Sequence, residues 1–191
     1  MIAVNPTQDQ LNRAAGFYEF DALNNSIMEG KSNIFGALGE VLFGDLYPEW
    51  RKVESYDFDF VGPNDRTVDI KTKRTTAVPQ PDWNCSVAAT SGHQQPDYFF
   101  FIRVTEDYER AWLLGWLSRD EFYDLAHFGK RGEPDPSKPG WVYRADCWNV
   151  AVRDLRPPSE SKATGAYRCH KCGMLTGGPM SDPKLWCGCP F

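Results

Sequence analysis

Residues 56–73 read YDFDFVGPNDRTVDIKTK. Apolar and polar residues alternate on both sides of the segment GPND, which is typical of strands with one buried face. Glycine, proline, asparagine and aspartate together favour a tight turn. The segment therefore predicts a β-hairpin whose turn centres on Pro63–Asn64.

Both arms of this hairpin carry acidic residues. The alternation of side chains puts Asp69, Lys71 and Lys73 on one face. The turn places Asp59 opposite Val68 or Asp69, and Asp57 opposite Ile70 or Lys71. Carboxylates that face each other across a hairpin repel, and a fold tolerates them when a cation lies between them. Such carboxylates could hold Mg²⁺ while a lysine stabilises a phosphate, which is the chemistry of phosphodiester hydrolysis. The plainer interpretation is the solvated face of an amphipathic strand.

A segment with the sequence GALGE, at 36–40, precedes the hairpin in a pattern typical of a helix. Together the two segments resemble the PD-(D/E)XK nuclease superfamily, and more narrowly small phage and prophage nucleases with a G-x-x-G-E helix before the hairpin. The resemblance implies that Glu40 is the acidic residue of the helix, that Asp59 and Asp69 bind Mg²⁺ or Mn²⁺, and that Lys71 is catalytic. It further implies that DNA is the substrate and that the fold is a restriction-endonuclease-like mixed β-sheet flanked by helices.

Two assignments within this resemblance stay open. The family's proline is missing, because an aromatic residue precedes both Asp57 and Asp59. Asp57 therefore remains a candidate site residue, although the hairpin geometry favours Asp59. The family also carries a polar residue, often glutamine, just before the next core strand. Gln94 and Gln95 both match, and Gln95 is included among the candidate catalytic residues.

The rest of the chain indicates an α/β protein with a mixed sheet. Apolar residues recur at helical spacing in two segments near the N-terminus, and a short helix is expected after a capping Ser118. Strands are expected in two strongly apolar runs and in one later segment. The expected helices are 8–25, 33–47 and 118–128, and the expected strands outside the hairpin are 97–104, 111–117 and 141–152.

Four of the six cysteines lie near the C-terminus in a CxxC and a CxC pair: Cys169, Cys172, Cys187 and Cys189. Each pair can present two thiolates to one tetrahedral ion, so this pattern predicts a structural Zn²⁺ site. The predicted organisation is a nuclease domain at 1–156, a polar linker at 157–166 and a four-cysteine zinc ribbon at 167–191. Two disulfides are the rival interpretation and would suit an extracellular chain. Cys85 and Cys147 are expected to be buried small residues.

The hydrophobic fraction of 41% is enough for a packed core, and the formal net charge of −5 argues against coating nucleic acid through bulk charge. No apolar run approaches a membrane span, and no secretory signal is recognisable. We therefore expect a cytoplasmic protein that binds no membrane, for example in the cytoplasm of a phage-infected host cell. The expected partners besides DNA are a second copy of the chain, in a homodimer, or other DNA-processing proteins. The alternative functions are a nuclease-fold DNA-binding protein without catalysis and a zinc-ribbon adaptor.

Overall fold

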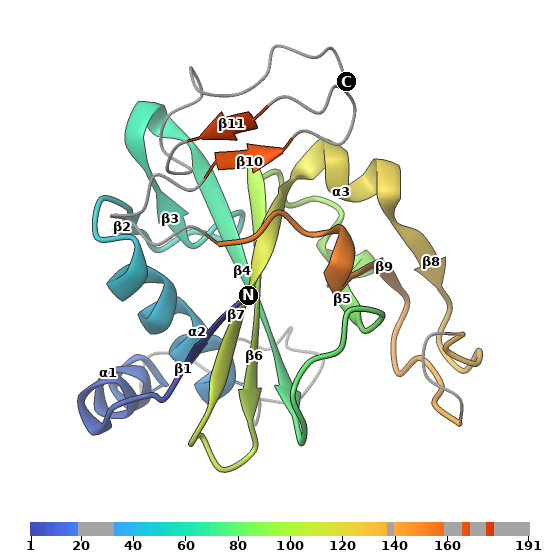
Figure 1. Ribbon diagram of the computed structural model, residues 1–191, viewed down its shortest axis with the longest axis horizontal. Helices are drawn as coiled ribbons and strands as arrows, with labels where there is room; N and C mark the ends of the chain where they lie inside the picture. Colours follow the sequence, from blue (N-terminus) through green and yellow to red (C-terminus); the bar gives the residue numbers. More distant parts are fainter. Residues whose placement is uncertain (19–32, 137–139, 159–165, 169–174, 178–191) are drawn as a thin grey trace.

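The computed structural model describes residues 1–18, 33–136, 140–158, 166–168 and 175–177 (Figure 1). The four cysteines of the predicted zinc ribbon lie outside these residues, as does the second half of the predicted first helix. None of the helices within these residues is long and apolar enough to cross a membrane.

The centre of the molecule is a six-stranded mixed sheet. Its only parallel neighbours are the two central strands, and every other pair is antiparallel. The prediction of an α/β protein with a mixed sheet is thus confirmed. In spatial order the strands are β1 (Ile2–Val4), β7 (Ala111–Ser118), β6 (Tyr98–Thr105), β4 (Thr67–Thr75), β3 (Phe60–Val61) and β2 (Arg51–Lys52).

The predicted hairpin is formed by β3 and β4. Phe60 pairs with Val68, and the backbone N–H of Asp59 donates to the carbonyl oxygen of Val68 at 2.9 Å. Asp59 thus lies beside Val68 and Asp69, the two residues expected opposite it. The turn of the hairpin contains the short 3₁₀ helix η1 (Pro63–Asp65), where Asn64 has a φ of 59°. Asparagine tolerates this left-handed conformation better than most residues.

The first arm of the hairpin is shorter than predicted. The alternation in YDFDFV suggested a strand from Tyr56 onward, but β3 contains only Phe60 and Val61. Before it, the backbone N–H of Asp57 donates to the Ser55 hydroxyl at 3.1 Å. This local bond forms in place of a ladder bond to β4, so the segment bends away from the sheet.

On one face of the sheet lies α2 (Asn33–Leu46), and α1 (Gln8–Tyr18) packs against α2 (Figure 1). The helical repeat of α2 turns Leu38 and Phe43 fully into the core. Phe43 contacts the rings of Phe60 and Phe100, with centroids 4.9 and 5.0 Å away. These contacts fix α2 across the hairpin and the central strand.

The opposite face carries a second core and a second sheet (Figure 1). Ser118 caps α3 (Arg119–Leu125) through a capping box with Glu121, so the predicted cap is confirmed. The helix ends sooner than expected, because β8 (His127–Gly129) follows it. The three-stranded sheet has the order β5 (Asn84–Ala88), β9 (Cys147–Ala151), β8, and two 3₁₀ turns adjoin it, η2 (Ala89–Ser91) and η3 (Val152–Asp154).

Two short strands near the C-terminus form a separate antiparallel pair. Ala166 in β10 (Ala166–Arg168) pairs with Gly177 in β11 (Leu175–Gly177). In sequence, this pair flanks the CxxC motif.

Candidate active site

The candidate site is built on β4, where alternation separates apolar from charged side chains. Val68 and Ile70 point into the core that includes α2. Asp69 and Lys71 project from the opposite face, where their partners on β6 are Phe99 and Phe101. One strand thus both anchors the core and presents a carboxylate beside an ammonium.

Asp69 is a buried acid, with 4% of its surface exposed. Its Oδ2 atom lies 2.6 Å from Nζ of Lys71, an ion pair. Among the described residues, this buried oxygen accepts no hydrogen bond of good geometry. A buried carboxylate oxygen with one close cation keeps lone pairs for a further ligand.

Asp59 faces Asp69 across the hairpin. Its Oδ2 accepts a hydrogen bond from the backbone N–H of Ile70 at 2.6 Å. Part of the residue is exposed, but its carboxyl group is largely surrounded by protein. Burial, and then the charges of Asp69 and Glu40, raise the pKa of Asp59 well above its usual value. Asp59 is therefore repelled by both of these neighbouring acidic groups.

Glu40 approaches these aspartates from α2 and is tied to β2. Its Oε2 lies 2.7 Å from Nζ of Lys52. The preceding residue, Gly39, lies so close to β4 that an added Cβ would stand 1.9 Å from Oγ1 of Thr72. The glycine therefore lets α2 lie directly on β4, and this contact brings Glu40 to the site.

Gln94 completes the surroundings of Lys71. Nζ of Lys71 donates to Oε1 of Gln94 at 3.3 Å, and Nε2 of Gln94 donates to the carbonyl oxygen of Tyr56 at 2.6 Å. Gln95 is exposed and forms no hydrogen bond with the residues that the structure describes. Of the two glutamines left open by the sequence, the structure brings Gln94 to Lys71 and does not bring Gln95 there.

Asp57 is likewise not brought to the site. It lies in the bend before β3 and is exposed. It is also absent from the charged groups that act on Asp59. Its expected place opposite Ile70 or Lys71 required a longer first arm of the hairpin, and that arm does not continue past Phe60.

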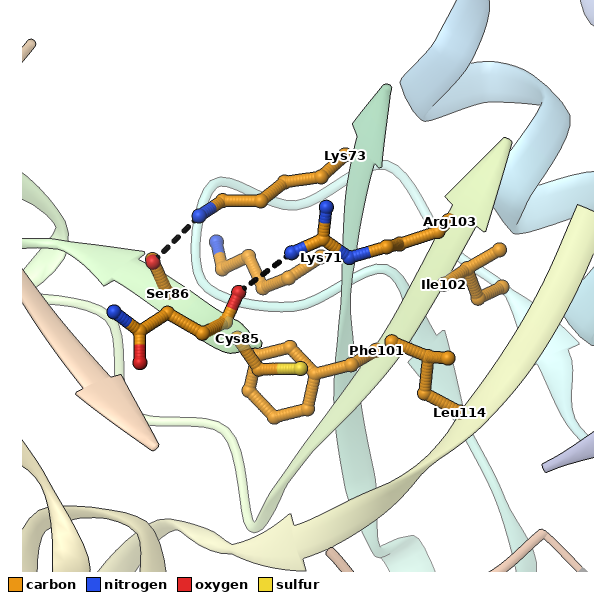
Figure 2. A pocket seen from close by; sticks show the side chains of 9 residues that line it. Lys71, Lys73, Cys85, Ser86, Phe101, Ile102, Arg103 and Leu114 are labelled. Carbon is orange, nitrogen blue, oxygen red and sulfur yellow. Dashed lines mark hydrogen bonds between the residues drawn. The ribbon is translucent and has the colours of Figure 1, made fainter. Parts of the chain in front are cut away.

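A cationic cluster lies beside Lys71 on the same face of the sheet (Figure 2). Lys73 follows on β4, and Arg103 on β6 is its direct partner in the parallel register. Both border a small hollow, partly open to solvent, together with Ser86 on β5. The sequence placed Lys73 on this face but missed Arg103 and Ser86. The sequence did carry a signal for Arg103, because it is the one charged residue within the apolar strand YFFFIRV.

The donor set at the site is oxygen-rich. Among the described residues, no three histidine, cysteine or acidic side chains are close enough to enclose a metal ion. Mg²⁺ does not require such a cage, since it is usually held by one or two carboxylates, waters and substrate phosphates. Asp59 and Asp69 could supply that pair, and Oδ2 of Asp69, which keeps lone pairs beside Lys71, fits this role. Glu40, whose carboxylate is paired with Lys52, would act on the metal ion from a greater distance than the two aspartates.

Comparison with known proteins adds no family to this geometry. No protein-family model matches the sequence, and no curated protein matches it.

Proposed function

We propose that this chain is a Mg²⁺-dependent deoxyribonuclease of the PD-(D/E)XK type, with a restriction-endonuclease-like core. The observation that carries the proposal is the convergence of Asp59 with the charges of Asp69 and Glu40 beside Lys71. Acidic groups held against one another oppose folding unless a cation joins them. A lysine within the same cluster supplies the phosphate-binding charge that such a hydrolase needs.

The side chains divide the work of phosphodiester cleavage. Asp59 and Asp69 would hold the metal ion, and Lys71 would donate to the phosphate oxygens as negative charge develops there. Gln94 fixes the Lys71 ammonium between strand and loop, and its own amide is fixed by Tyr56. Bound Mg²⁺ would supply the positive charge that makes water nucleophilic near neutral pH and offsets the charge of the phosphate.

A second candidate is a nuclease-fold protein that binds DNA without cutting it. The observation that favours it is the pairing of two of the acids with lysines, Glu40 with Lys52 and Asp69 with Lys71. These ion pairs offset carboxylate charge without a metal. The two candidates differ in whether a divalent cation displaces these lysines.

The deciding experiment is to incubate the full chain with linear duplex, circular duplex, single-stranded and branched DNA, each with Mg²⁺ and with EDTA. We expect cleavage of at least one substrate in Mg²⁺ and none in EDTA. Binding of DNA without cleavage under either condition would favour the second candidate.

Cation binding should also stabilise the fold. Because a ligand that binds only the folded state adds about 2.7 kcal/mol at 100 times its Kd, we expect saturating Ca²⁺ to raise the melting temperature by several degrees. Asp59→Asn should melt above wild type without metal, because it removes one repelling charge and keeps an oxygen for the Ile70 N–H. The variant should respond less to Ca²⁺. Calorimetric scans with Ca²⁺ and with EDTA test both parts, and an unshifted wild type would oppose a cation site.

We further propose that Cys169, Cys172, Cys187 and Cys189 hold one structural Zn²⁺. The pairing of β10 with β11 on either side of the CxxC motif in sequence supports this proposal. Elemental analysis of protein purified without added metal should find about one zinc per chain. Cys172→Ser should release it, whereas Cys85→Ser, on buried β5, should retain it. Absence of zinc together with absence of free thiols in the tail would establish disulfides instead.

A further inference from the structure

The cationic cluster next to the candidate active site is defined by Lys73, Arg103 and Ser86, with Lys71 at its border. The side chains of Lys71, Lys73 and Arg103 all extend toward Ser86 on β5 (Figure 2). Together with Ser86, they come from three strands that belong to two different sheets. The cluster therefore depends on the tertiary fold, not on one basic stretch of sequence.

Lys73 and Arg103 are like charges held side by side. They are direct neighbours across the parallel pair of β4 and β6. Among the described residues, neither forms an ion pair with a carboxylate, whereas Lys71 is paired with Asp69. Burial of the ammonium, and then the neighbouring guanidinium, lower the pKa of Lys73. Like charges in this position destabilise a sheet unless an anion lies between them.

The polar groups of the cluster are fixed but not saturated. Nζ of Lys73 donates to Oγ of Ser86 at 2.6 Å, and that hydroxyl donates to Oδ1 of the fully buried Asn149. Arg103 donates to the carbonyl oxygen of Asn84 at 2.8 Å and stacks on the ring of Trp83, 5.0 Å from its centroid. Its buried Nε has no hydrogen-bond partner within the described part of the chain. Lys73 also keeps N–H donors, since an ammonium has three.

The position of the cluster indicates which anion it takes. Lys73 follows Lys71 by two residues on one strand face, a separation of roughly 6.6 Å. This is close to the distance between adjacent phosphates along one nucleic-acid strand. A strand whose scissile phosphate contacts Lys71 would thus bring its next phosphate to Lys73 and Arg103.

We propose that Lys73, Arg103 and Ser86 form a binding site for the phosphate next to the scissile one, and so hold the substrate strand in register. The proposal deepens and rests on the proposed nuclease function. Arginine and lysine suit this role because the guanidinium presents several donors to phosphate oxygens and the ammonium supplies a compact charge.

The test measures DNA binding by fluorescence anisotropy, using the full chain in EDTA so that no cleavage intervenes. Lys73→Gln and Arg103→Met are compared with wild type across a series of salt concentrations. Each should bind about tenfold more weakly, as expected for loss of one charge-assisted contact. The slope of log K against log salt should become shallower by about 0.7 to 0.9, the change for one lost phosphate contact.

Arg74→Met is the matched control. Arg74 neighbours Lys73 on β4 but points to the other face, where its guanidinium lies 5.6 Å from the ring centre of Phe35. Like Lys73→Gln, the Arg74→Met substitution removes one positive charge from β4. It should leave both the DNA affinity and the slope of log K against log salt at the wild-type values. Thermal melts identify any variant that does not fold, and Lys73→Gln carries the test if Arg103→Met fails to fold.

The substrates distinguish two sources of the phosphate. An equal loss on oligonucleotides with hydroxyl ends and with 5′-phosphate ends assigns an internal phosphodiester. A loss confined to 5′-phosphorylated ends assigns a terminal phosphate. Wild-type affinity in both variants would overturn the proposal, as would an equal loss of affinity in Arg74→Met. It would also be overturned if Lys73→Gln and Arg103→Met lost as much binding to polyglutamate, a polyanion without phosphate, as to DNA.

These outcomes are separable from the nuclease proposal. If the protein cuts no DNA but the two variants bind more weakly, the cluster still binds a DNA phosphate, and only its place next to a scissile phosphate fails together with catalysis. If the protein cuts DNA and the variants bind like wild type, only the phosphate site fails.

Discussion

Asp69→Asn and Lys71→Ala should each slow Mg²⁺-dependent DNA cleavage by at least ~100-fold while the protein remains folded. Asp69→Asn removes a metal-binding charge while keeping the shape of the side chain. Lys71→Ala removes the ammonium that lies 2.6 Å from Asp69 and contacts Gln94. Cleavage rates at saturating Mg²⁺, with circular dichroism as a check on folding, measure the effect. Near-wild-type cleavage by folded Asp69→Asn would remove the basis for the assigned site.

Asp57 and Asp59 provide a matched pair for the same experiment. Asp59→Asn should be nearly as damaging as Asp69→Asn, because Asp59 lies among the charges of the site. Asp57→Asn should stay close to wild type, because its side chain is exposed in the bend before β3. Both substitutions remove one charge from the same segment, so bulk charge cannot explain a difference. The reverse order of effects would show that the wrong aspartate has been assigned.

The parts of the fold that the sequence predicted well are those governed by local rules. The register of β3 and β4 follows from the turn residues, since Asn64 accepts a positive φ and thereby fixes which residues pair. α2 and β6 were predicted because each has a long apolar pattern of a single period. Ser118 was recognised as a cap because it precedes a helical segment, and the structure adds that Glu121, three residues on, completes a capping box with it.

The missed elements are short and depend on distant partners. β1, β2 and β8 contain three, two and three residues, which is too few to establish a period. β5 follows a proline-rich loop and becomes a strand by pairing with β9, more than fifty residues later. The sequence carries no local signal for that pairing, so the second sheet could not be predicted.

The candidate site likewise has some residues that the local sequence pattern predicted and others that only distant contacts bring together. Asp69 and Lys71 were placed together by strand alternation, and the hairpin brings Asp59 next to Asp69. The choice of Gln94 over Gln95 depends on how the loop before β6 passes Tyr56, which pattern does not encode. The pairing of Glu40 with Lys52 and the approach of Arg103 to Lys73 are tertiary contacts that only the fold supplies.

The contact between α2 and β4 leads to a second large effect. Gly39→Ala should destabilise the protein by about 1–3 kcal/mol relative to Gly36→Ala, because the new methyl overpacks the contact with β4. An added Cβ at Gly39 would meet Oγ1 of Thr72 at 1.9 Å, while one at Gly36 meets no atom within 4 Å. Both substitutions replace a helical glycine with alanine and gain the same helix propensity. Their difference in melting temperature and urea midpoint therefore isolates the helix–strand contact.

The same substitution should weaken catalysis through Glu40. Displacement of α2 from β4 moves this carboxylate away from Asp59, so Gly39→Ala should cleave DNA more slowly than Gly36→Ala at a temperature where both are folded. Thr72→Ala should rescue both defects in part, because it removes the obstructing hydroxyl and leaves the Cβ of residue 72 at a tight 3.1 Å. Thr72→Ala alone should be nearly neutral, since its buried hydroxyl has no hydrogen-bond partner among the described residues. Equal stability and activity in the two glycine variants would show that α2 does not depend on this contact to position Glu40.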